Sequence, residues 1–228
     1  LSVSDAGAIA AAYGSVSAVT FVAATSFLEG RAMAAGGHMV AVMALMESPA
    51  IIVGVMLITL YDRDASRNVG LRDVIHHSFT NGSVLMVLGS LLIGIVADEK
   101  QAMGIKPFTT DIFKGFLAVF LFEMGLITGA KLRSFRTYGW FATVVGIVAP
   151  LVNGCAVAVA SQLVTHDPAN RFMFAILAAS ASYIAVPAAM RLAAPKADPG
   201  LYIPMALGVT FPFNITIGMP LYWWVVSL

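Results

Sequence analysis

The sequence predicts an all-α polytopic membrane protein. Hydrophobic residues make up 59% of the chain and charged residues only 11%, whereas soluble domains average about 25% charged residues. The mean hydropathy is +0.88, and long apolar segments follow one another with short polar connections. A soluble fold is therefore excluded. The net charge of +1, without any basic run, also argues against a nucleic-acid partner.

Seven segments are apolar over roughly the 20 residues that a helix needs to cross a bilayer. The longest connection between them, 62–80, has apolar residues at helical spacing and is expected to form a helix at the membrane surface. Because the chain starts without Met, a basic segment or a cleavage site, we interpret it as part of a longer protein. The predicted spans are 6–28, 38–60, 82–98, 109–130, 138–164, 170–193 and 201–226.

Lysine and arginine are unevenly divided between the two sides of the membrane. The set of connections that includes 62–80 carries eight of them, and the opposite set carries five. Cytoplasmic connections are enriched in these residues. We therefore expect a multi-pass protein of the cell inner (plasma) membrane, with 62–80 in the cytoplasm and the C-terminus outside.

A short polar interruption occurs twice, and a proline follows each copy at nearly the same distance. Ser15 precedes Pro49 by 34 residues, and Ser180 precedes Pro212 by 32 residues. Breaks at matching places in two halves of a hydrophobic protein indicate a transport site between structural repeats. With seven spans the two copies run in opposite directions across the bilayer. The pattern thus predicts an inverted repeat with two discontinuous helices that cross.

The serines of the two interruptions are the first candidates for a binding site. Irregular backbone persists in lipid only where it lines a cavity or is covered by protein. Ser15, Ser17, Ser180 and Ser182 could cap the helices that follow the breaks, which would leave two positive helix ends facing an anion. Small residues also let helices pack closely, and the sequence leaves that alternative open.

Glu47 is an ionisable residue in the middle of a span, next to Pro49. A charge at that depth costs about 3 kcal/mol on insertion scales, so it normally faces a cavity and a partner. The carboxylate, a carbonyl freed by Pro49 and the Ser48 hydroxyl suit a hard cation such as sodium. In the second half Thr210 stands at the matching position, followed by Asn214, and both offer neutral oxygens. An acid that only pairs within the bundle is the alternative.

At these residues the chain resembles the sodium-dependent bicarbonate transporter family known from cyanobacteria. In the second repeat Tyr183 stands where that family has an Asp. The matching segments of the first repeat are Gly14-Ser15-Val16-Ser17-Ala18-Val19-Thr20 and Met46-Glu47-Ser48-Pro49-Ala50, and those of the second repeat include Ser180, Ser182, Ile184, Pro187 and Arg191.

The resemblance implies two inverted sets of five helices, of which the first three helices are absent from this chain. It implies bicarbonate at the crossing of the broken helices, sodium beside it, a homo-trimer and a PII-like cytoplasmic regulator. It divides the chain into core-domain helices that end the first repeat (1–61), a cytoplasmic connection (62–81), gate-domain helices (82–136) and core-domain helices of the second repeat (137–228).

The predicted function is secondary transport of a small anion, bicarbonate in the first place, with sodium as the coupling ion. A proton-coupled carrier of another anion and a non-transporting membrane sensor or scaffold are the alternatives. An enzyme is not expected, because no nucleophile–base pair or metal-ligand group is visible. The residues assigned to the substrate are Ser15, Ser17, Ser180, Ser182 and Tyr183, and those assigned to the cation are Glu47, Ser48, Thr210 and Asn214.

Overall fold

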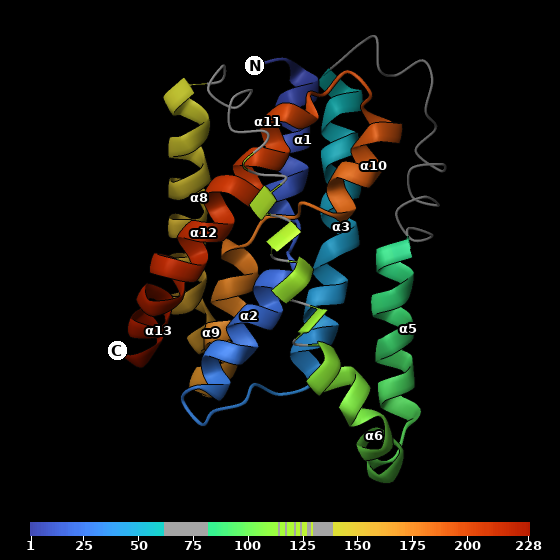
Figure 1. The fold of residues 1–228 in the computed structure, drawn as a ribbon. Coiled ribbons are helices and arrows are strands. Elements are labelled where there is room, and N and C mark those ends of the chain that lie inside the picture. Colours follow the sequence, from blue (N-terminus) through green and yellow to red (C-terminus); the bar gives the residue numbers. More distant parts are fainter. Residues whose placement is uncertain are drawn as a thin grey trace.

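The protein is helical throughout the part of the chain that the structure, a computed structural model, describes (Figure 1). This confirms the predicted helical class. The connection 62–80, for which a surface helix was predicted, lies outside the described residues. The described residues are 1–61, 82–113, 115–116, 118–120, 122–123, 125–126, 129 and 139–228.

The first and sixth predicted spans are each divided into two helices by a short break. The first break covers Ser15 to Ser17 and the second covers Ser180 to Ile184, so both interruptions lie where the serines predict them. Figure 1 shows the two broken helices running in opposite directions. The four helices are α1 (Val3–Gly14), α2 (Ala18–Glu29), α9 (Pro168–Ala179) and α10 (Ala185–Ala193).

The remaining long helices surround the broken pair and contain prolines. Pro49 lies inside one of them and Pro150 inside another. The C-terminal helix changes twice into π-helical turns, which often mark functional sites. These helices are α3 (His38–Tyr61), α8 (Gly139–Ala160) with the 3-10 turn η4 (Ser161–Leu163), and the continuous series α11 (Pro199–Pro204), η5 (Met205–Thr210), α12 (Phe211–Phe213), η6 (Asn214–Gly218) and α13 (Met219–Ser227).

Four described segments are long and apolar enough to cross a membrane, which supports a multi-pass membrane protein. Three other predicted spans do not form such a segment in the described residues. The span at 82–98 is represented by the 15-residue helix α5 (Gly82–Val96), the span at 170–193 is interrupted, and the span at 109–130 is described only in part. The four segments are Val3–Glu29, His38–Ile58, Gly139–Leu163 and Pro199–Ser227.

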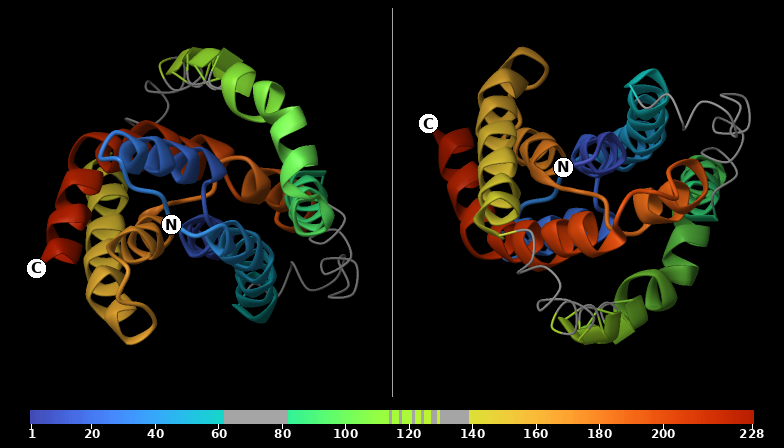
Figure 2. Two further views of the ribbon diagram at one scale, coloured as in Figure 1. Left: turned by 90° about the horizontal axis from the view of Figure 1, so that it is seen from below. Right: turned by 90° about the horizontal axis from the view of Figure 1, so that it is seen from above.

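The polar connection predicted after residue 98 is itself helical in the structure. α6 (Glu99–Lys106) begins at Asp98, whose side chain accepts a hydrogen bond from the N–H of Gln101 at 2.7 Å. Gln101 returns a bond to the N–H of Asp98 at 3.0 Å. This reciprocal pair is a capping box, which favours helix initiation. A π-helical turn, η2 (Pro107–Ile112), continues α6, and both views of Figure 2 show α5 and α6 at the periphery of the molecule.

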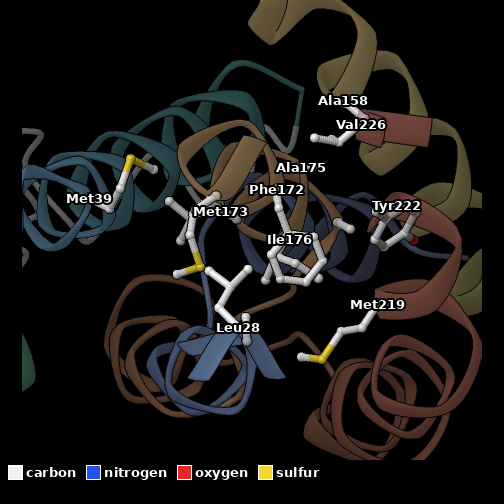
Figure 3. Packing of buried hydrophobic residues seen from close by; sticks show 14 of the residues in the cluster. Leu28, Met39, Ala158, Phe172, Met173, Ala175, Ile176, Met219, Tyr222 and Val226 are labelled. Atoms are coloured by element: carbon white, nitrogen blue, oxygen red, sulfur yellow. The ribbon is translucent and has the colours of Figure 1, made fainter. Parts of the chain in front are cut away.

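Two separate hydrophobic clusters hold the halves of the broken helices. The α2–α9 cluster is centred on Leu28 and Phe172, with side chains from α3, α8 and α13, and Figure 3 shows its members directed toward one another. The α1–α10 cluster includes Ala11, Ile51 and Met190, with residues of α3 and α11. Each cluster therefore combines one half-helix from each end of the chain.

The layer between the two clusters contains most of the buried polar side chains in the described residues. Helical spacing places Glu47 between Met43 of the α2–α9 cluster and Ile51 of the α1–α10 cluster, at i−4 and i+4. A polar layer between two apolar cores is the arrangement expected for a site at mid-membrane depth. The buried polar residues of this layer are Ser15, Ser17, Thr20, Ser180, Ser182, Thr210 and Asn214.

α1 and α3 pack closely because glycines face each other's helix. A Cβ on Gly54 would lie 2.5 Å from the Cβ of Ala11, and a Cβ on Gly7 would collide with Ile58. Small residues at helix contacts are typical of membrane proteins, where close van der Waals packing drives association. This contact holds the helix that carries Glu47 against the first broken helix.

Candidate functional site

The two breaks are hydrogen-bonded directly to each other. The N–H of Ser182 donates to the carbonyl oxygen of Ala12 at 2.8 Å, and the N–H of Ser17 donates to Oγ of Ser180 at 3.0 Å. Ala12 belongs to the last turn of α1, where carbonyl groups lack intrahelical donors. Each break thus donates one N–H group to the other broken helix, so the two breaks are in direct contact.

The four predicted serines are buried, and their hydroxyl groups form hydrogen bonds mainly with backbone groups of the two breaks and the adjoining helices. Oγ of Ser17 accepts from the N–H of Thr20 at 3.1 Å and so caps α2. Oγ of Ser182 accepts from the N–H of Val186 at 3.3 Å. Ser180 donates to the carbonyl of Leu177 at 2.9 Å. The hydroxyl groups therefore stabilise the backbone at the two breaks. Any contact with a ligand there would fall mainly to backbone N–H groups at the start of α2 and α10.

Ser15 connects the first break to the helix that carries the candidate cation ligand. Its N–H donates to the carbonyl of Ala11 at 3.1 Å, which completes the last turn of α1. Its hydroxyl points to the carbonyl oxygen of Glu47 at 3.4 Å, the long end of hydrogen-bond distance. The first break and Glu47 are consequently neighbours.

A cavity of about 310 Å³ lies at the beginning of both helices that follow the breaks. Ala18 and Val19, the first two residues of α2, line it together with Ile184, the residue before α10. The first N–H groups of a helix have no acceptor within the helix and carry its positive dipole end. The starts of α2 and α10 thus lie beside one cavity whose described lining residues are all apolar, and an anion site at these helix ends stays a prediction.

Tyr183 lies in the second break with its hydroxyl near the first turn of α2. The side chain is 8% exposed, and its hydroxyl lies close to the side chains of Ser17 and Thr20. The geometry is not that of a hydrogen bond, so within the described residues this buried oxygen has no hydrogen-bond partner. A buried hydroxyl without a partner is costly. Its capacity to donate a hydrogen bond is thus unused within the described residues.

Glu47 is half-buried and makes no ion pair with a residue in the described part of the chain. Glu123, an acid in the same hydrophobic environment by sequence, is exposed. Uncompensated intramembrane acids normally face a pathway or a cavity. The position of Glu47 beside Ser15 fits a cation ligand. The Ser48 side chain lies outside the described part of the structure.

Thr210 links the C-terminal helix to the first break and to α8. The Tyr13 hydroxyl lies 2.7 Å from Oγ1 of Thr210, which donates to the carbonyl of Gly146 at 2.7 Å. That carbonyl lacks its helical donor because Pro150, four residues later, has no N–H. One lone pair of the Thr210 oxygen is left for another ligand.

Asn214 closes the end of α9 at the second break. Its amide donates to the carbonyl of Ala179, the last residue of α9, at 2.8 Å. The Tyr222 hydroxyl lies 3.2 Å from Oδ1 of Asn214 and donates to the carbonyl of Pro150 at 2.9 Å. Within the described residues, no hydrogen bond joins Asn214 or Thr210 to Glu47, so their shared cation site stays a prediction.

Sequence reasoning missed two tyrosines that complete these contacts. Tyr13 lies in the last turn of α1, two residues before the first break, and Tyr222 lies on the last helix turns of the chain. Pro150 frees the carbonyl of Gly146, but Thr210 donates to it, so this local signal points to neither tyrosine. In the described residues no group of three or more His, Cys, Asp or Glu side chains could hold a metal ion.

The family of the chain follows from a sequence comparison over almost its whole length. Residues 1–227 match the Na+-dependent bicarbonate transporter superfamily. The chain belongs to this superfamily. The resemblance inferred from the two serine interruptions and Glu47 is thereby confirmed. No functionally curated protein matches the chain. Membership in a transporter superfamily supports a membrane transport protein with a small anion as substrate, rather than an enzyme.

Proposed function

We propose that the protein is a secondary transporter that moves a small anion, bicarbonate in the first place, together with sodium by alternating access. The observation that carries the proposal is the direct bonding of the two breaks, which brings the first turns of α2 and α10 to one cavity. Membership in the superfamily supports the same substrate and ion.

The anion would be held mainly by backbone groups. Ser17 already satisfies the N–H of Thr20, so the N–H groups of Ala18 and Val19 are available at the start of α2. The Tyr183 hydroxyl adds a neutral donor at the same turn. Among the described residues that line the cavity there is no lysine or arginine. Neutral donors and helix dipoles bind an anion moderately, and moderate binding suits a carrier that must also release its substrate.

Sodium would be held by Glu47 on the same polar layer. The carboxylate supplies the charge, and the carbonyl of Leu45 is freed because Pro49 has no N–H. Thr210 and Asn214 would contribute through the one acceptor site that each oxygen keeps after its present bonds. Because Ser15, the first residue of the break, contacts the carbonyl of Glu47, an ion there would affect the anion site directly.

The alternation of access would come from movement between the two proposed domains. We assign residues 1–61 and 137–228 to a core domain and 82–136 to a gate domain. The peripheral position of α5 and α6 in Figure 2 supports this division. The broken helices would keep their mutual bonds while the core domain moves. We further propose that the protein lies in the plasma membrane and that it forms a homo-trimer.

A proton-coupled carrier is the second candidate, because Glu47 has no ion pair within the described residues. In that mechanism the carboxylate would carry a proton instead of coordinating sodium. Both mechanisms use the same anion site and differ only in the coupling ion.

Uptake of labelled bicarbonate into proteoliposomes that contain the full-length protein tests the proposal. We expect uptake driven by an inward sodium gradient, no uptake when choline replaces sodium, and little response to a proton gradient alone. Ser182→Leu should abolish uptake because the larger side chain fills the buried break, whereas Ser26→Leu, on the exposed side of α2, should not. Uptake driven by protons without sodium would favour the second candidate, and no uptake of any anion would refute transport.

A further inference from the structure

Three phenylalanines of the peripheral segment border the cavity beside the starts of α2 and α10. Phe113, Phe116 and Phe120 line it, and their spacing of three and four residues places them on one face of a helix. The described residues around them are helical. On its other side the cavity is lined by α2 and by the residue before α10. The described lining is therefore apolar throughout, with a phenylalanine face opposite the two helix ends.

This cavity belongs to both repeats rather than to one of them. Val19 and Ile184 are separated by the same number of residues as Ser15 and Ser180, so they hold matching positions beyond the two breaks. Both line the same cavity. An ion that approaches the two helix ends from the side of the peripheral segment must therefore pass between them and the phenylalanine face.

The border between the peripheral segment and the broken helices is loosely packed. Among the described residues, an added Cβ on Gly94 or Gly115 of this segment would meet no atom within 4 Å, whereas one on Gly146 of α8 would lie 3.0 Å from Val209. A second cavity, of about 540 Å³, lies along the same border between α3 and α5. Loosely packed apolar surfaces can slide past each other more easily than interlocked ones.

An apolar space of this kind is a barrier to ions. A hydrated anion or sodium ion that enters it loses contacts with water, and no lining side chain replaces them. Apolar cavities in proteins stay dry, and hydrophobic constrictions close ion pathways by excluding water. The same surface that cannot bind an ion can therefore keep ions away from the two breaks.

We propose that Phe113, Phe116 and Phe120 form a hydrophobic gate over the starts of α2 and α10. In the arrangement seen here the gate excludes water and ions from this side of the breaks. Phe120 holds it in place, because it packs against the small cluster that contains Val19 and Tyr183. The gate opens when the peripheral segment moves away from the broken helices. The inference rests on the proposed transport function and names the residues that control access to its site.

The test is the rate at which a charged, water-soluble thiol reagent modifies a cysteine placed inside the cavity. Val22→Cys is introduced into the full-length protein in proteoliposomes, with the native cysteines, Cys155 among them, replaced by Ser. The reagent is a methanethiosulfonate that carries a quaternary ammonium group. Modification should be slow because the thiol faces a dry space. Adding Phe116→Ala should raise the rate about tenfold or more, since water then reaches the thiol.

Further variants separate the gate from a general loosening of the fold. Phe116→Leu keeps an apolar side chain of similar length, so the slow rate should be retained. Phe122→Ala removes an exposed ring outside the cavity lining and should leave the rate unchanged. Leu163→Cys, at a position that is 91% exposed, gives the rate of a freely accessible thiol. Phe113→Ala is a second opening variant, to be used if Phe116→Ala does not fold.

The outcomes separate this inference from the proposed function, because labelled bicarbonate uptake is measured on the same preparations. Equal modification rates in Phe116→Ala and Phe122→Ala would overturn the gate, and so would a Val22→Cys rate as high as that of Leu163→Cys. Bicarbonate uptake alongside either result would leave the transporter standing. A faster rate in Phe116→Ala without uptake of any anion would support the apolar barrier and refute transport.

Discussion

The N–H of Ser182 lies 2.8 Å from the carbonyl oxygen of Ala12, so the second break closes the end of the helix that precedes the first. The reciprocal bond from Ser17 to Ser180 makes the two breaks one unit. A change in one break must therefore affect the other. The two broken helices are expected to move together in any transport cycle.

Replacing Ser180 by Ala is expected to destabilise the protein through the other break. The variant leaves the buried N–H of Ser17 without its acceptor, and an unsatisfied buried group costs about 1–3 kcal/mol. Thermal denaturation of the purified protein in detergent measures the loss. Ser26→Ala, at an exposed position of α2, is the control. Equal stability of the two variants would mean that the bond between the breaks contributes nothing.

Replacing Glu47 by Gln should weaken sodium activation more than it weakens folding. The side chain keeps its shape but loses the charge that would balance the ion. We expect the sodium concentration for half-maximal uptake to rise roughly tenfold, equivalent to about 1.4 kcal/mol. Glu123→Gln removes an exposed acid and should have no such effect. Unchanged sodium activation in Glu47→Gln would remove Glu47 from the cation site.

Replacing Arg171 by Met is expected to loosen the ends of two helices. Arg171 is 7% exposed, and its guanidinium donates to the carbonyls of Val226 at 2.9 Å and Ala158 at 3.1 Å. Its charge lies at the negative ends of α8 and α13. Losing both bonds should cost about 2 kcal/mol or more, visible as a lower melting temperature. Arg31→Met, an exposed arginine, provides the comparison, and a similar loss there would contradict the assignment.

Replacing Gly54 by Ala tests the contact between α1 and α3. The added Cβ would lie 2.5 Å from that of Ala11, so the helices must separate at an expected cost of about 1–3 kcal/mol. Gly89→Ala is the matched control, because nothing lies within 4 Å of its added Cβ. There the better helix former should gain about 0.5–1 kcal/mol. Opposite shifts in melting temperature are therefore expected, and shifts of the same sign would contradict the packing model.

The local signals of the sequence predicted the breaks, because a serine interruption and a helix-internal proline act on the backbone around them. Ser15 to Ser17 and Ser180 to Ile184 are broken as predicted. The Asp98 to Gln101 capping box is an equally local signal, and it makes the connection after residue 98 helical. Arg171 was counted among the charges of a connection, yet it is buried against two helix ends.

The partners of the polar residues could not be predicted, because they depend on contacts between distant parts of the chain. Thr210 bonds to Tyr13, which lies 197 residues earlier, and Asn214 bonds to the carbonyl of Ala179. Periodicity assigns such residues to the interior but says nothing of which oxygen each one meets. The cation roles of Thr210 and Asn214 thus stay predictions.

The pairing of half-helices from opposite ends of the chain also governs how the protein is made. α1 and α2 contribute to two different clusters, and each cluster needs residues from α9, α10 or later. When residues 1–61 have left the ribosome but α9 and α10 have not, neither cluster can be complete, and the Ser17 N–H lacks its acceptor on Ser180. The break at Ser15 to Ser17 is therefore expected to reach its final structure only after residues 158–226, which complete both clusters, have been synthesised.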